Sequence, residues 1–74
     1  MTVITRDTMT NDLEIEVLGS KAKSIMKKAL IKALGKDHGE YLAEYGVVNT
    51  GNNRVYIVVN QVESKELKDA LLEV

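Results

Sequence analysis

Few side chains in this 74-residue chain combine the types and the spacing that enzyme chemistry requires. His38 is the only histidine, and it lies in the segment Gly35-Lys36-Asp37-His38-Gly39. Acid–base catalysis needs a histidine that a partner group orients, and adjacency in sequence does not make Asp37 and His38 a catalytic pair. We therefore expect His38 to be a solvated or helix-capping residue and not a catalytic one.

Nucleophilic and metal-binding groups give no stronger candidates. The chain has no cysteine, so neither a disulfide nor a thiolate metal site can form. Asp12, Glu14 and Glu16 could collect a hard cation, but acids that alternate along a strand normally form its solvent face. No serine lies in a nucleophile motif. We expect a protein that is not an enzyme, with no catalytic residue, no metal, no cofactor and no small-molecule substrate.

The most informative pattern is a run of lysines that contains no acid, although the whole chain carries a net charge of −1. The six lysines are Lys21, Lys23, Lys27, Lys28, Lys32 and Lys36. Ile31 lies among them, nearly opposite the apolar stripe of the predicted helix. An apolar residue ringed by charges is typical of the centre of a protein interface. The pattern predicts a partner-binding helix face made of Lys23, Lys27, Lys28, Ile31 and Lys32.

The same lysines leave open an alternative function, RNA or DNA binding through the helix over 20–34 and the loop over 35–39. A basic helix, a Gly-x-x-x-Gly loop, the strand that starts at Arg54 and a C-terminal amphipathic helix are loosely similar to a KH RNA-binding module. That family has two residues between its loop glycines, preferably basic ones, whereas this chain has three and one is Asp37. A net negative charge and the lack of aromatic residues among the lysines also disfavour nucleic acid. A protein partner is the preferred hypothesis.

Length and composition predict one domain over 12–74, preceded by a polar, flexible segment over 1–11 in which Val3 and Ile4 could add a short edge strand. A chain this short buries only about 60% of its unfolded surface, so a second copy or another partner could supply the missing burial. The N-terminal stretch lacks a signal-peptide pattern, and no segment approaches the ~18 apolar residues of a membrane span. We expect a cytoplasmic protein without membrane contact. Because Met9-Thr10 repeats Met1-Thr2, a translation start at either methionine stays open.

Two regular elements can be read from the first half of the chain. Leu13, Ile15 and Val17 alternate with acids, which predicts a half-buried strand. Apolar residues then recur at helical spacing from Ala22 to Leu34. Ser20 is the expected N-cap of this helix, and Gly35 is the expected stop.

The segment over 36–62 allows two interpretations. In the first, which we favour slightly, residues 40–50 form a strand that pairs with a strand over 54–62. In the second, Asp37 caps a short helix that runs to Gly46, and the hairpin starts only at Val47. Ser64 is the expected cap of a C-terminal helix.

These elements predict an α+β, two-layer sandwich in the order β-α-β-β-α, with helices on one face of a mixed three-stranded sheet. Glu14, Glu16, Tyr56 and Val58 should lie on the other face. Tyr56 and Val58 are apolar side chains rimmed by charge, so they form the second predicted binding surface, for a partner or for a homodimer. The expected function is a small protein–protein interaction module of regulator, adaptor or inhibitor type, such as an accessory protein of a phage.

Overall fold

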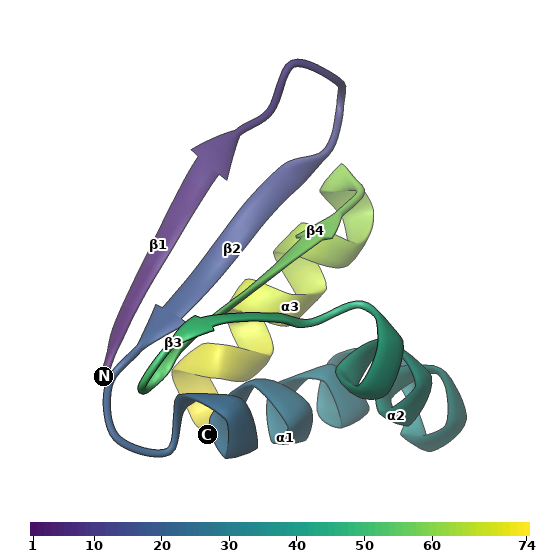
Figure 1. Cartoon of the computed structure of the whole chain (residues 1–74). Helices are drawn as coiled ribbons and strands as arrows, with labels where there is room; N and C mark the ends of the chain where they lie inside the picture. Colours follow the sequence, from purple (N-terminus) through teal and green to yellow (C-terminus); the bar gives the residue numbers. More distant parts are fainter.

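The computed structural model describes residues 1–74 and shows a four-stranded antiparallel sheet with helices packed on one side (Figure 1). The elements are β1 (Thr2–Asp7), β2 (Leu13–Leu18), α1 (Ala22–Leu34), α2 (Lys36–Tyr45), β3 (Val48–Gly51), β4 (Arg54–Val59) and α3 (Gln61–Glu73). The strand order in the sheet is β1-β2-β4-β3, and every pairing is antiparallel. The α+β class is confirmed. The predicted mixed, three-stranded sheet in the order β-α-β-β-α is wrong, because the chain has one more strand and one more helix.

The additional strand is β1, in the threonine-rich segment that was expected to be loose. Its six residues pair in register with the six residues of β2, from Thr2 opposite Leu18 to Asp7 opposite Leu13. Threonine, valine and isoleucine all favour extended backbone, so polarity alone is a poor guide to disorder. The turn after β1 has its own hydrogen bonds, in which the Thr8 hydroxyl donates to the Asp12 carbonyl oxygen at 2.8 Å.

The additional helix is α2, which takes the place of residues 40–45 of the favoured strand over 40–50, while β3 begins only at Val48. The second interpretation, a short helix that runs to Gly46 and is followed by the hairpin, is therefore confirmed apart from its cap. Gly35 ends α1 and also precedes the first residue of α2, so Asp37 lies inside the helix and does not cap it. Tyr41, Ala43 and Tyr45 alternate as in a strand, but on the helix Tyr41 and Tyr45 are neighbours, with ring centroids 5.1 Å apart. The packing of α2 against α1 decides between the two conformations, because buried Gly39 lets the two backbones meet at Ile31.

The core lies between the sheet and the pair of helices α1 and α3. Strands β2 and β4 contribute alternate side chains, and helices α1 and α3 contribute side chains three or four residues apart. The buried apolar residues are Ile15, Val17, Ala22, Met26, Ala29, Leu30, Val55, Ile57, Val59, Leu67, Ala70 and Leu71. None of them comes from β1, β3 or α2, so the outer strands and α2 surround a centre built by the other four elements.

Both serine caps were predicted wrongly. The residue before α1 is Lys21, in a left-handed conformation with φ 63°, and it makes no side-chain cap. Asn60 caps α3 by accepting a hydrogen bond from the Glu63 amide at 2.8 Å. Ser64 therefore falls inside the helix, where it is fully buried and its hydroxyl has no hydrogen-bond partner. None of the helices has the length and apolar content needed to cross a membrane.

Candidate functional site

The face of the sheet that points away from α1 and α3 is uncovered, and in Figure 1 it faces the viewer with α3 behind it. Alternation along each strand and the antiparallel register decide which side chains share this open face. Glu16 lies between Ile4 on β1 and Tyr56 on β4, and Glu14 lies opposite Val58. The four side chains that were expected on this face therefore form two adjacent cross-strand pairs at its centre.

An ion cluster occupies the middle of the open face. The Arg6 guanidinium donates from Nη1 to Glu16 Oε1 at 2.8 Å and to Glu14 Oε2 at 3.0 Å. Arg54 donates from Nη2 to Glu16 Oε2 at 3.2 Å. Each oxygen of Glu16 thus has its own arginine, and the two arginines and two glutamates sum to zero charge.

Glu16 is unusual because its carboxylate is almost hidden on a face that no other element covers. Its side chain is only 5% exposed, whereas those of Arg6 and Arg54 are about half exposed. The hydrogen bond from Arg6 lowers the pKa of Glu16, and that from Arg54 adds to this effect against the opposing effect of burial. The same contact raises the pKa of Arg6. Both shifts favour the charged forms of Glu16 and Arg6, so the contact between them is already made in the chain on its own.

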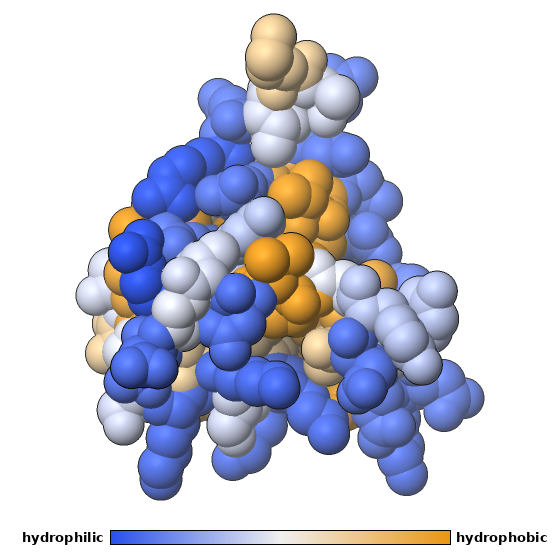
Figure 2. All heavy atoms as spheres, in the orientation of Figure 1, coloured by the Kyte–Doolittle hydropathy of each residue, from blue (hydrophilic) through white to orange (hydrophobic).

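Apolar side chains surround this cluster. Ile4, Leu18 and Tyr56 are partly buried, while Val58 on the central strand β4 is 46% exposed and Val48 on the edge strand β3 is 44% exposed. Figure 2 shows the result from the same direction as Figure 1: hydrophobic atoms reach the surface in the middle of the molecule and hydrophilic atoms border them. The open face thus combines a neutral polar centre with exposed apolar contacts.

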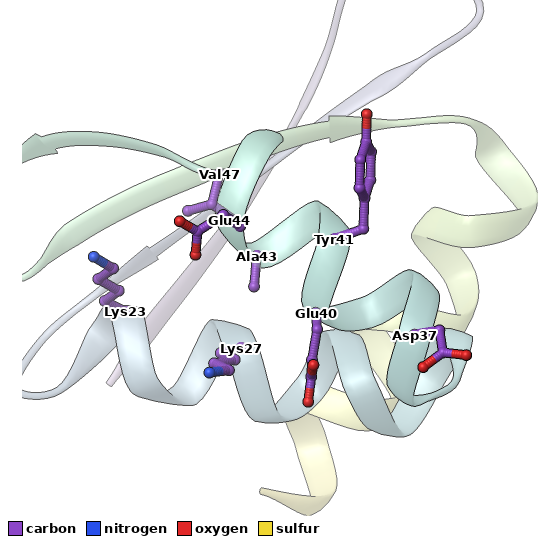
Figure 3. Close-up of a pocket in the computed structure, with 8 residues that line it drawn as sticks. All are labelled: Lys23, Lys27, Asp37, Glu40, Tyr41, Ala43, Glu44 and Val47. Carbon is purple, nitrogen blue, oxygen red and sulfur yellow. The ribbon is translucent and has the colours of Figure 1, made fainter.

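The residues of the predicted helix face lie in three different surroundings. Lys23 and Lys27 line a groove of about 520 Å³ between α1 and α2, and the acids Asp37, Glu40 and Glu44 are also in its lining. Figure 3 shows Lys23 and Asp37 at opposite ends of this groove. Lys28 is exposed, and Lys32 forms an ion pair with Glu73 of α3. Ile31 is half-buried, with its backbone against Gly39 of α2. Lys23, Lys27 and Ile31 therefore lie on the side of α1 next to α2, whereas Lys32 lies on the side next to α3. The five residues do not share the same surroundings.

His38 lies near the N-terminus of α2, with Nε2 3.2 Å from Glu63 Oε2 of α3. Its side chain is about half exposed, and the contact links two helices at the surface. The segment over 35–39 is not a free loop, because Lys36 onward is helical and Gly39 is buried. Nowhere do three or more acidic or histidine side chains converge closely enough to bind a metal ion.

Sequence reasoning missed Arg6 and Arg54, the two arginines that hold the open-face cluster. The signal was present in β1, where Thr2, Ile4 and Arg6 occupy alternate positions, but it is readable only once that segment is taken as a strand beside β2. No protein-family model, no curated protein and no solved structure matches this chain.

Proposed function

We propose that this chain is a small, non-enzymatic protein-binding module that uses the open face of its sheet. The observation that carries the proposal is the neutral cluster of Glu14 and Glu16 with Arg6 and Arg54, set among exposed apolar side chains on an uncovered face. Here the most central acid is nearly buried, and Val48 and Val58 remain exposed beside it.

The charges of the cluster suit a protein partner better than a polyanion. Because both carboxylates are already paired, covering the cluster does not leave an unpartnered buried charge, which would be costly. The arginines keep donor groups for carbonyl or carboxylate oxygens of a partner, and apolar contacts beside them exclude water. Nucleic acid would need a surplus of positive charge, which this face lacks.

The size of the face indicates how strong the interaction should be. Four strands about 4.8 Å apart and six residues of about 3.3 Å each give a flat area of roughly 400 Å². A stable interface usually buries about 800 Å² on each partner. The face alone therefore fits a transient regulatory contact, or a partner that also extends beyond the sheet.

The double variant Tyr56→Lys/Val58→Lys tests the proposal, with Val62→Lys as its matched control. Val62 is 71% exposed on α3, on the opposite side of the sheet from the open face. Proteins cross-linked to the tagged chain in cells of its source would be identified by mass spectrometry, with and without nuclease. We expect one protein partner that resists nuclease, is retained by Val62→Lys and is lost in the double variant.

Two outcomes would contradict the proposal. A partner that the double variant retains and Ile31→Ala weakens by about 1 to 3 kcal/mol would place the interface on α1. Loss of all capture after nuclease treatment, together with binding that falls steeply with salt, would favour nucleic acid. Sedimentation of the purified wild type distinguishes a second copy from a foreign partner.

A further inference from the structure

The two edges of the sheet differ in how well they are protected against pairing with another strand. β3 has four residues, ends at Gly51, and shifts its register with β4 between Asn49 and Gly51. β1 has six residues, all paired in register with β2, and it contains no proline, glycine, lysine or bulge. Short or bulged strands are among the devices that keep a sheet edge from pairing with another chain. β3 is therefore a protected edge, and β1 is an unprotected one.

The side chains of β1 also suit a further strand. The residues over 2–5 are all β-branched and uncharged, and such residues favour extended backbone. Charges occur only at the end of the strand, where Arg6 is already paired with glutamates of β2 and Asp7 is the last residue. β1 is an outer strand of the sheet, and Figure 1 shows no other element beyond it. A strand is the element that satisfies its outward N–H and C=O groups in series.

We infer that β1 pairs antiparallel with β1 of a second copy, about a two-fold axis at Ile4, so that the two chains share one eight-stranded sheet. Opposite residues of an antiparallel pair point to the same side, so the axis passes through one residue of the strand. With the axis at Ile4, this residue faces its own counterpart, Thr2 faces Arg6, and Val3 faces Thr5. This register pairs five of the six residues of β1 and leaves out Asp7.

Three features favour a second copy over a foreign strand. The register sets β-branched side chains opposite one another at its centre, which stabilises a pair of strands. It brings no like charges together, because the two Arg6 residues lie about 13 Å apart along the strands, beyond the ~8 Å range of electrostatic screening, and each is paired with glutamates of its own chain. The association also closes on itself, since it uses both unprotected edges and leaves only the two β3 edges exposed.

The pairing extends the open face across both chains. Ile4 points to the same side as Glu16, so the two Ile4 side chains lie between the two ion clusters. Eight strands about 4.8 Å apart give a continuous face of roughly 800 Å², twice that of one copy. A stable interface buries about 800 Å² on each partner, so the dimer supplies the area that one chain lacks. This consequence rests on the proposed function of the open face, whereas the pairing of β1 does not.

Sedimentation of the purified chain tests the pairing without any partner. We expect a monomer–dimer equilibrium in the wild type and at least tenfold weaker association in Val3→Lys, because lysine on an edge strand opposes pairing. Val48→Lys is the matched control, since Val48 lies on the other edge strand and is 44% exposed against 37% for Val3. It should leave the dimer unchanged, as should the open-face variant Tyr56→Lys/Val58→Lys. Circular dichroism would establish that each variant is folded.

Single-cysteine variants test the register itself, because the chain has no cysteine of its own. Directly opposite Cα atoms lie about 4.5 or 5.5 Å apart, within the range of roughly 4.4 to 6.8 Å that a disulfide bridges. Ile4→Cys should therefore give a disulfide-linked dimer under mild oxidation. Thr2→Cys should not, because its counterparts lie about 13 Å apart along the strands, and neither should Val58→Cys on the open face.

Several results would overturn the inference. One is a wild type that stays monomeric at millimolar concentration, and another is a dimer that Val48→Lys weakens as much as Val3→Lys. Cross-linking through Val58→Cys in place of Ile4→Cys would move the contact to the open face. A monomer whose β1 amides become protected from hydrogen exchange only when a captured protein is added would assign the edge to that foreign strand. A dimer that cross-links through Ile4→Cys but captures no protein would support the pairing and count against the proposed function.

Discussion

Replacing Gly39 by alanine tests how α2 is held against α1. A Cβ atom built at Gly39 would lie 2.5 Å from Ile31 Cα, 2.6 Å from Ile31 N and 2.7 Å from the Leu30 carbonyl carbon. All three are backbone atoms, so no change of rotamer can make room. Ordinary contacts begin at 3.4 Å, and α2 would have to move away from α1 by close to 1 Å.

Two opposing effects set the size of the change. Alanine is the better helix former by about 1 kcal/mol, which favours the variant at a position inside a helix. Overpacking against a rigid neighbour typically costs about 1 to 3 kcal/mol, and a clash with backbone belongs at the upper end. We expect a net loss of about 1 to 2 kcal/mol in the free energy of unfolding. For a chain of this size that corresponds to a fall in Tm of roughly 4 to 16 °C.

Urea unfolding followed by circular dichroism would measure the loss, with Glu40→Ala as the control on an exposed position of the same helix. The control should change the free energy of unfolding by no more than about 0.5 kcal/mol. If Gly39→Ala instead stabilised the protein by about 1 kcal/mol, helix propensity alone would account for it. The close approach of α2 to Ile31 would then be refuted.

Four further substitutions address single features of the structure. Asn60→Ala should cost about 1 kcal/mol in urea unfolding because it removes the N-cap of α3, and an unchanged midpoint would contradict that role. Ser64→Ala should be neutral or stabilise by up to about 1 kcal/mol, since a buried hydroxyl without a partner is removed; a clear loss would reveal a hydrogen bond that the structure does not show. The lowered pKa of Glu16 means that its contribution is complete above the ordinary value of 4.5 and is lost as the pH falls through the lower folded-state value. Urea midpoints should therefore fall more steeply at acid pH in the wild type than in Glu16→Gln, and parallel profiles would argue against the ion cluster. His38→Ala should leave both folding and partner capture nearly unchanged, because its contact with Glu63 is exposed.

How much of the fold was predictable depends on how clearly the apolar residues of each segment follow the spacing of a helix or of a strand. Leu13, Ile15 and Val17 alternate without interruption, and the stripe from Ala22 to Leu34 ends at a glycine, so β2 and α1 were predicted close to their observed bounds. The segment around Tyr41 fits the spacing of a strand and that of a helix, and the close approach of Gly39 to α1 is what favours the helix. The spacing of apolar residues within one segment cannot predict that two segments pack against each other.

The candidate site was predictable in part for the same reason. Tyr56 and Val58 were placed on the uncovered face, with Glu14 and Glu16, from alternation alone, and the register pairs these residues directly. The role of Arg6 depended on recognising β1 and its position beside β2. The surroundings of Ile31 depended on α2, which was expected as a strand. In both cases the missing information was which elements become neighbours, and neighbours are set by tertiary packing.

The order of the strands also has a consequence for how fast the chain can fold. β1 with β2 and β3 with β4 are hairpins between segments close in sequence, but the central pairing of β2 with β4 joins residues such as Ile15 and Ile57, roughly 40 residues apart. The entropy of closing that long loop opposes this pairing until α1 and α2 have shortened the connection by folding against each other. The helical pair should therefore form early, and the joining of the two hairpins should limit the rate. Substitutions that loosen α1 from α2, or that weaken the hairpin of β1 and β2, would then slow folding.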